Sequence, residues 1–141
     1  RTLMKILSNV ERGEKLPEGK YLVSLIFCSD EFIKELNKNY RGKNKATDVL
    51  SFSVPDAFPQ SDEAKLLGEI YISLETVINR NREDLSKARS EVNLLFCHGL
   101  LHLLGYTHDT PEERKEMIRK QSEYLGIPIS EAWIKPNKRH K

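Results

Sequence analysis

Three of the four histidines in this chain lie in one short segment, at positions 98, 102 and 108. His98 and His102 are four residues apart, so on an α-helix they lie about 40° apart around the axis and roughly 6 Å along it, within reach of one ion. Gly105 lets the backbone take a left-handed conformation and double back, which brings His108 toward the same point. The segment therefore predicts a metal site at the end of a helix.

Three imidazoles leave one coordination position of a tetrahedral metal open. Catalytic zinc sites have this arrangement, whereas structural zinc sites usually fill all four positions with protein ligands, mostly cysteine. Cys97 is not expected to be a fourth ligand, because it adjoins His98 and points about 100° away from it around the helix. We therefore predict one Zn²⁺ per chain, bound by His98, His102 and His108. His140 lies in a basic tail and is predicted to be solvated.

The spacing of the three histidines, H-x-x-x-H-x-x-G-x-x-H, also matches the pattern of metzincin proteases. In those proteases a glutamate follows the first histidine and serves as the general base. Gly99 occupies that position here. The motif therefore keeps a metal scaffold without the peptidase carboxylate, and the base for any hydrolysis must come from elsewhere.

The composition is that of a soluble globular domain. A chain of 141 residues with 38% apolar and 31% charged residues can bury a stable core without disulfide bonds or structural metals. No apolar run approaches the roughly 20 residues that span a bilayer, and the first residues lack the apolar stretch of a secretory signal. We therefore expect a single domain over residues 1–141, a cytoplasmic location without membrane contact, and two unpaired cysteines, Cys28 and Cys97.

The charge distribution gives weak support for RNA binding. The net charge is only +2, but basic residues cluster before and within the loop 41–45 and in a tail of about 135–141. Clusters of this kind are more often solvated faces than binding sites, so they favour an RNA partner without establishing it. The members of the two clusters are Lys34, Lys38, Arg41, Lys43 and Lys45, and then Lys135, Lys138, Arg139 and Lys141.

The pattern of apolar residues predicts an α+β fold, in which a small mixed sheet of three to four strands packs against four to five helices. Strands are expected at 21–27, 47–54 and 67–72, where β-branched and aromatic residues concentrate. The polar loop 55–65 suits a hairpin. The second and third strands are therefore predicted to be antiparallel neighbours.

Helix boundaries are marked by capping residues. A helix capped by Ser29 is expected to end at Gly42, and a second helix opens near Ser73 and breaks near 84–86. The helix that carries the histidines is expected at about 86–104 and is predicted to be buried. A final helix starts with the capping box of Thr110-Pro111-Glu112-Glu113 and closes at Gly126.

Four ordered blocks of the sequence resemble the bacterial YbeY family. They are Asn37-Lys38-Asn39-Tyr40-Arg41-Gly42, Thr47-Asp48-Val49-Leu50-Ser51-Phe52, Leu67-Gly68-Glu69-Ile70 and the segment from His98 to His108. Members of that family are metal-dependent, single-strand-specific endoribonucleases, implicated in maturing the 3′ end of 16S ribosomal RNA and in ribosome quality control. The resemblance implies zinc held by the three histidines and a functional arginine at Arg41. The third block usually holds aspartate where this chain has Glu69, so the resemblance assigns no role to that carboxylate.

Arg41 is the candidate ligand of the scissile phosphate. Its planar guanidinium can offer two parallel N–H donors to phosphate oxygens as charge develops on the phosphorane. The alternative is a surface ion pair with Asp48 or Glu69, and Asp48 either orients Arg41 or caps the loop. Asp109 is assigned to the N-terminus of the following helix rather than to catalysis. We therefore predict Arg41 and His98 as catalytic residues.

Three functional classes follow from these features. The favoured one is a zinc-dependent endoribonuclease that acts on single-stranded ribosomal RNA, with the ribosome or ribosomal proteins as further partners. The second is another zinc hydrolase, including a peptidase, which the histidine spacing favours and Gly99 opposes. The third is a non-catalytic ribosome-assembly factor with structural zinc. RNA and peptide substrates separate the first two, and metal removal separates the third, because loss of a structural metal unfolds the protein.

Overall fold

The computed structural model describes residues 2–55, 60, 63–82 and 84–134 of the chain. The predicted basic tail of about 135–141 and part of the predicted loop 55–65 lie outside the described residues. Within them, the elements follow in the order α1 (Thr2–Gly13), β1 (Lys20–Cys28), α2 (Asp30–Arg41), β2 (Val49–Ser53), β3 (Ala64–Ser73), α3 (Leu74–Arg80), α4 (Leu85–Leu103), α5 (Pro111–Leu125) and the short 3₁₀ helix η1 (Ile129–Glu131).

The strands form a mixed sheet with the order β1-β3-β2. β1 and β3 run parallel, with Ile26 opposite Tyr71 and Leu25 opposite Ile70. β2 and β3 run antiparallel, with Leu50 opposite Tyr71. The α+β class, the mixed sheet and the antiparallel pairing of the second and third strands are thus confirmed.

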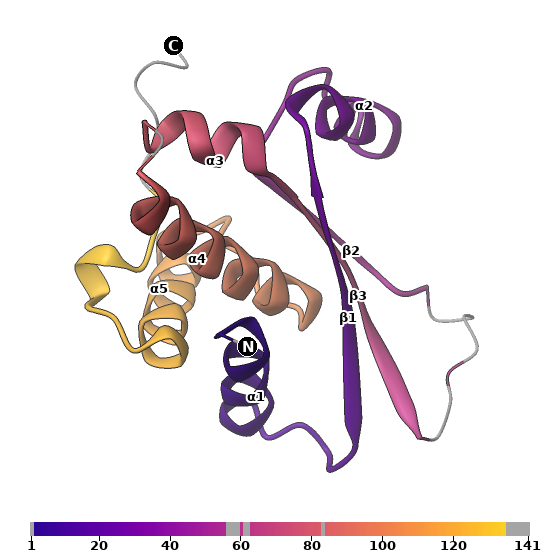
Figure 1. Cartoon of the computed structure of the whole chain (residues 1–141). Helices are drawn as coiled ribbons and strands as arrows, with labels where there is room; N and C mark the ends of the chain where they lie inside the picture. Colours follow the sequence, from indigo (N-terminus) through magenta and orange to yellow (C-terminus); the bar gives the residue numbers. More distant parts are fainter. Residues whose placement is uncertain (1, 56–59, 61–62, 83, 135–141) are drawn as a thin grey trace.

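Most of the helices cover one face of the sheet. In Figure 1, α1, α3, α4 and α5 lie to one side of the strands, and α2 packs near one end of the sheet. The core forms where the helical layer meets the central strand, and its fully buried members include Ile70, Ile72, Leu100, Leu101 and Met117. Among the described helices, none combines the length and apolar character needed to cross a membrane.

Helix α4 is the central helix, and it is buried as predicted, with Leu95, Phe96 and Cys97 in the core. Gly99 faces β3 from this helix. A Cβ atom there would lie 3.0 Å from both Cδ1 and Cγ2 of Ile70, closer than ordinary packing allows. The missing side chain at position 99 therefore lets α4 approach the sheet.

Local caps set the helix ends. Thr110 and Glu113 form the predicted capping box of α5, and Gly126 ends that helix with a φ of 68°. α4 starts at Leu85 rather than 86, because the Asp84 side chain accepts hydrogen bonds from the N–H groups of the first turn. These ends depend on a few neighbouring residues, which is why the sequence predicts them well.

Helix α1 was not among the predicted elements. Its apolar residues have the helical spacing i, i+3, i+4 and i+7, and they are Leu3, Ile6, Leu7 and Val10. Ile6 and Val10 are buried, and α1 packs against α4 and α5. This spacing is visible in the sequence, so α1 was predictable from it.

Candidate metal centre

The three histidines converge where α4 ends and the chain turns back. His98 and His102 lie one turn apart on α4, and Gly105 reverses the chain with a φ of 103°. One ligand nitrogen from each histidine, including His108, lies within 4.8 Å of the other two. The Nε2 atoms of His98 and His102 are 3.0 Å apart. The structure thus brings the predicted ligands together.

Hydrogen bonds fix which nitrogen of each helical histidine carries the proton. The Nδ1 atom of His98 lies 2.8 Å from Oε1 of Gln121, whose Nε2 donates to the carbonyl of Ala132 over 2.5 Å. The Nδ1 atom of His102 lies 2.8 Å from the carbonyl oxygen of Tyr106. Both partners are acceptors, so each Nδ1 donates. In the neutral rings the two Nε2 atoms are therefore unprotonated, and they face each other.

Two facing lone pairs at 3.0 Å repel each other unless a cation lies between them. Two nitrogens bound to one tetrahedral zinc at about 2.0–2.1 Å are separated by about 3.3 Å, close to the observed spacing. Burial, together with the neighbouring His102, lowers the pKa of His98 to about 4, and burial also lowers the pKa of His102. Both rings are therefore neutral near pH 7, the form that binds metal. The residues fit a zinc-class ion.

A tryptophan closes one side of the histidine cluster. The ring of Trp133 lies 5.2 Å from those of His98 and His108, centroid to centroid, in edge-on contact with each. The chain contains one tryptophan. The segment after α5 therefore helps to shape the site, and Trp133 is a natural fluorescent reporter of events there.

A cleft opens beside the three histidines, and Arg41, Lys43 and Lys45 also line it. The Nη2 atom of Arg41 donates to the carbonyl of Ser51 over 3.3 Å, and the guanidinium carbon lies 5.9 Å from the ring centre of Phe52. The guanidinium is exposed and has donors left for a ligand. The structure thus places the predicted arginine and the predicted metal ligands around one cavity.

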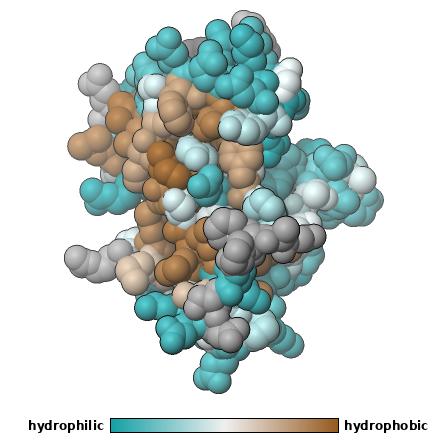
Figure 2. Space-filling view, turned by 90° about the vertical axis from the view of Figure 1, so that its right-hand side faces the viewer, coloured by the Kyte–Doolittle hydropathy of each residue, from teal (hydrophilic) through white to brown (hydrophobic). Residues whose placement is uncertain are grey.

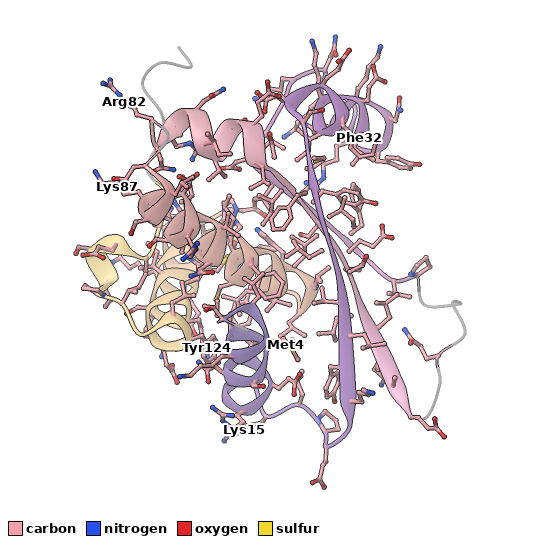
Figure 3. The ribbon with its side chains drawn as sticks, in the orientation of Figure 1. Met4, Lys15, Phe32, Arg82, Lys87 and Tyr124 are labelled. Carbon is pink, nitrogen blue, oxygen red and sulfur yellow. The ribbon has the colours of Figure 1, made fainter. Side chains whose placement is uncertain are left out.

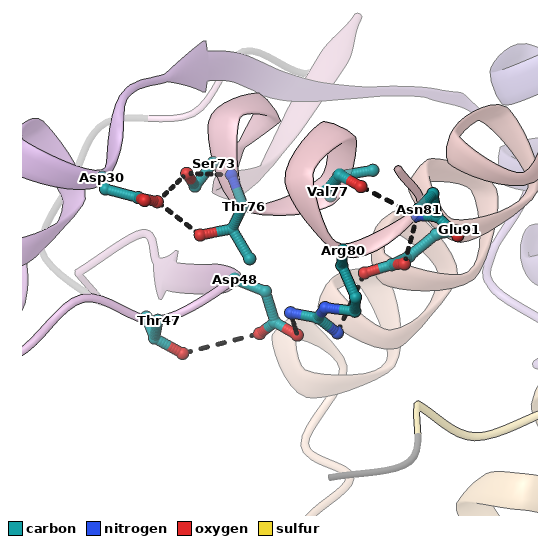
Figure 4. Close-up of polar contacts among 9 residues, drawn as sticks. All are labelled: Asp30, Thr47, Asp48, Ser73, Thr76, Val77, Arg80, Asn81 and Glu91. Atoms are coloured by element: carbon teal, nitrogen blue, oxygen red, sulfur yellow. Dashed lines mark hydrogen bonds and ion pairs between the residues drawn. The ribbon is translucent and has the colours of Figure 1, made fainter. Parts of the chain in front are cut away.

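The acidic partners considered for Arg41 are engaged elsewhere. Asp48 pairs with Arg80 at 3.2 Å, and Arg80 pairs with Glu91 at 2.9 Å (Figure 4). Glu69 accepts from the hydroxyl of Tyr71 over 3.1 Å. Within the described residues, Arg41 forms no ion pair with Asp48 or Glu69, so the ion-pair alternative and the idea that Asp48 orients Arg41 are both wrong.

The ion pairs around Arg80 form a second polar cluster along the cleft wall. Asn81 donates to Glu91 over 2.8 Å, while burial raises the pKa of Glu91 against the opposing effects of Asn81 and Arg80. Asp48 and Arg80 both line the cleft. This cluster joins Asp48, the residue before β2, to α3 and α4, so it fixes the loop that carries the basic residues relative to the histidine helix.

Asp109 lies where the sequence placed it, just before α5. Its backbone N–H donates to Oε1 of Glu113 over 2.9 Å, as part of the start of that helix. Sequence reasoning missed Gln121, which has an available signal: Met117, Gln121 and Tyr124 share the i, i+4, i+7 stripe of α5, and all three are buried. A glutamine in an apolar stripe indicates a buried polar partner.

Comparisons with known proteins agree with this arrangement. The family model described as Endoribonuclease YbeY matches residues 1–127. A protein named Endoribonuclease YbeY from Halalkalibacterium halodurans is 38% identical over 130 residues, which cover 87% of this chain and 82% of that protein. The protein of the same name from Desulforamulus reducens is 42% identical over 134 residues, covering 89% and 88%.

A solved structure gives the same result. The solution structure of TM1509 from Thermotoga maritima matches with a TM-score of 0.52 and 28% identity, and the match covers 89% of this chain and 82% of that one. The family model spans most of the chain, and the relatives are similar over nearly their whole length. The chain therefore belongs to the endoribonuclease YbeY family.

Proposed function

We propose that this protein is a zinc-dependent endoribonuclease that cleaves single-stranded RNA, and that it acts in the cytoplasm on the 3′ end of 16S ribosomal RNA and in ribosome quality control. Family membership supports the endoribonuclease activity. The observation that carries the metal dependence is the pair of unprotonated Nε2 atoms of His98 and His102, which face each other at 3.0 Å. Ribosomal RNA, the ribosome and its proteins are the partners that this function implies.

The histidine cluster is proposed to hold the metal, with His98, His102 and His108 as its ligands. When bound, Zn²⁺ would act as a Lewis acid, which polarises a phosphoryl oxygen or lowers the pKa of water. Gln121 and the carbonyl of Tyr106 orient two of the rings, so that their Nε2 atoms point at a common centre. His98 is thus a catalytic residue through its direct contact with the metal.

Arg41 is proposed to bind the scissile phosphate. It lines the same cleft as the histidines and keeps unpaired N–H donors. A guanidinium aimed at the developing negative charge stabilises the transition state more than the ground state. Lys43 and Lys45 line the same cleft and attract the flanking phosphates.

The packing of Gly99 argues against a peptidase. The position that holds the general base in metzincins faces Ile70 in the core, and even a single Cβ atom there is crowded. A role for zinc only in stability is opposed by the position of its three proposed ligands, which line a cleft. RNA hydrolysis is the chemistry that the cleft supports best.

The test combines metal analysis with RNA cleavage. Purified wild-type protein should carry one zinc per chain and cut a single-stranded RNA, whereas His102→Ala should lose both properties. His140→Ala is the matched control, because it removes a histidine outside the cluster, and it should retain both. RNA cleavage by a metal-free wild-type protein, or by His102→Ala at the wild-type rate, would show that the proposed function is wrong.

A further inference from the structure

A row of aromatic rings lies on the face of the sheet that the helical layer leaves open. Centroid distances along the row are 6.3 Å from Phe32 to Tyr71, 5.8 Å from Tyr71 to Phe52 and 5.7 Å from Phe52 to Tyr40. Side chains alternate along β3, so Tyr71 points away from the core residues Ile70 and Ile72. We call Phe32, Tyr71, Phe52 and Tyr40 the aromatic row.

The aromatic row is accessible to solvent. Tyr40 is 71% exposed and Phe32 is 49% exposed, and the two rings between them are partly buried. Figure 2 shows a broad hydrophobic area on this side of the molecule, bordered by hydrophilic residues, and Figure 3 places Phe32 on α2 at the end of the sheet. Contiguous apolar surface that stays exposed to solvent often marks a binding site.

The aromatic row begins at the proposed catalytic cleft. Tyr40 adjoins Arg41 in the sequence, and the guanidinium of Arg41 lies over the ring of Phe52 at 5.9 Å. The same guanidinium lines the cleft with the three histidines and donates to Ser51 on β2. β2 is an edge strand of the sheet. An extended chain molecule bound at Arg41 would therefore pass directly from the cleft, around this edge, onto the aromatic row.

Ring geometry and charge together favour nucleic-acid bases as the occupant. Two of the three neighbouring pairs meet edge to face, at 69° between Tyr40 and Phe52 and at 79° between Phe52 and Tyr71, while Phe32 and Tyr71 are tilted at 33°. Tyr40 is therefore not stacked on Phe52, and at 71% exposure it keeps an open face. Aromatic rings next to a basic groove bind single-stranded nucleic acids by stacking the bases while cations hold the phosphates.

One carboxylate on the same face constrains the path of the ligand. Glu69 lies opposite Phe52 in the sheet and accepts from the hydroxyl of Tyr71. It repels phosphates but can accept hydrogen bonds from the amino groups of bases. The sugar-phosphate backbone is therefore expected along Arg41, Lys43 and Lys45, with the bases directed toward the rings.

We propose that Tyr40 and Phe52, with Tyr71 and Phe32 beyond them, stack the unpaired bases of RNA that flank the phosphate bound at Arg41. This inference rests on the proposed function and adds to it a source of single-strand selectivity. Bases in a duplex are already stacked on each other and cannot lie on the aromatic row. Unpaired bases can, whatever their sequence, because every base has a π-face.

The test compares RNA with and without bases. Binding of a fluorescent oligoadenylate and of the same oligomer with abasic positions is measured by anisotropy for the wild-type protein, Tyr40→Ala and Tyr40→Trp. Tyr40→Ala should weaken oligoadenylate binding on the order of tenfold, and Tyr40→Trp should restore it. The abasic oligomer should bind equally to wild type and Tyr40→Ala. Leu85→Ala, which truncates a side chain that is 68% exposed on α4, is the matched control and should bind as wild type.

The outcomes separate the stacking surface from the proposed function. If wild type cleaves RNA and Tyr40→Ala binds oligoadenylate as tightly as wild type, the stacking proposal is wrong while the nuclease stands, and the aromatic row is left for a protein partner. Equal weakening for the base-containing and abasic oligomers also overturns stacking. If wild type neither binds nor cleaves RNA, the proposed function fails together with the surface that depends on it.

Discussion

The Nδ1 atom of His98 lies 2.8 Å from the Oε1 atom of Gln121, so a residue of α5 fixes the orientation of a proposed metal ligand on α4. Gln121 is only 1% exposed, and its amide nitrogen is anchored on the carbonyl of Ala132. This anchor prevents the amide from offering its NH₂ group to the ring. His98 is thus held in the tautomer that presents a bare Nε2 atom to the proposed metal position.

Replacing Gln121 should therefore weaken metal binding while the fold is kept. Gln121→Leu has a similar volume but no acceptor, and zinc affinity should fall on the order of tenfold to a hundredfold. Gln121→Glu should keep most of the affinity, because a carboxylate still accepts from Nδ1. Zinc titration followed by Trp133 fluorescence and by competition with a chelator measures both, since that ring contacts two of the histidines.

The matched control for Gln121 is Ser122→Ala. Ser122 lies on the same helix, and its hydroxyl donates to the carbonyl of Ile127 over 2.5 Å, so its loss also removes a bond to the segment after α5. Within the described part of the chain it forms no hydrogen bond to a histidine, and the zinc affinity of Ser122→Ala should equal that of wild type. Equal affinities for wild type and Gln121→Leu would leave Gln121 with a packing role alone.

Metal removal should abolish RNA cleavage and leave the protein folded. The core around Ile70, Ile72 and Leu100 is fully buried by apolar packing between the helices and the sheet. Circular dichroism of the chelated protein should therefore keep its helical signal. The thermal midpoint should fall, because the metal stabilises the native state to which it binds. Zinc addition should restore cleavage. Unfolding on chelation would instead identify the zinc as structural.

Arg41→Lys should separate RNA binding from cleavage. Lysine keeps the positive charge at the cleft but lacks the planar pair of donors, so affinity for RNA should be largely kept. Single-turnover cleavage should fall about tenfold to a hundredfold, the effect of losing one well-placed transition-state donor. Arg41→Glu should lose both binding and cleavage. Equal cleavage rates for wild type and Arg41→Lys would reduce Arg41 to a general electrostatic role.

Features with local causes could be predicted from the sequence. The capping box of α5, the glycine that ends α2 and the spacing of His98 and His102 each depend on a few neighbouring residues. The antiparallel pairing of β2 and β3 followed from the short connection between them. For the same reason, the two histidines on one helix were the most readily predicted part of the candidate site.

Features that depend on distant partners could not be predicted in the same way. The parallel pairing of β1 with β3 joins segments separated by α2 and β2. The sequence of neither strand indicates which other strand it pairs with. Asp48 forms its ion pair with Arg80, which is 32 residues away in the sequence, and not with Arg41, which is much closer in the sequence. Only the folded backbone decides which cation reaches this carboxylate.

Gly99 should not tolerate a side chain. A Cβ atom would lie 3.0–3.2 Å from three atoms of Ile70, whose own position in the core is fixed by close packing. Gly99→Ala should therefore destabilise the protein by about 1–3 kcal/mol in urea unfolding, despite the higher helix propensity of alanine. Gly99→Glu should be worse, and it should not create casein cleavage. Lys87→Gly compared with Lys87→Ala, at an exposed position of the same helix, measures the contribution of helix propensity without this steric effect. A Gly99→Ala protein as stable as wild type would contradict the packing explanation.

Glu14 should make the protein less stable in acid. Its carboxylate accepts from the hydroxyls of Tyr106 and Tyr124 and pairs with Lys120 at 3.1 Å, and Tyr124 points from α5 toward α1 in Figure 3. Although burial raises the pKa of Glu14, the hydrogen bonds from Tyr124, Tyr106 and Lys120 outweigh it and lower the pKa below 4.5. The folded state therefore binds this proton less readily than the unfolded state.

A depressed pKa contributes stability that is fully present above the unfolded value and is lost as the pH falls through the folded value. The free energy of unfolding of wild type should thus decline below about pH 4.5. Glu14→Gln should be less stable at pH 7 and should show a shallower decline in acid, measured by urea unfolding across this range. Glu116→Gln removes an exposed ion pair with Arg119 and should change neither quantity appreciably, because such pairs contribute little. If Glu14→Gln and wild type lose stability in parallel as the pH falls, the acid sensitivity must originate in other carboxylates.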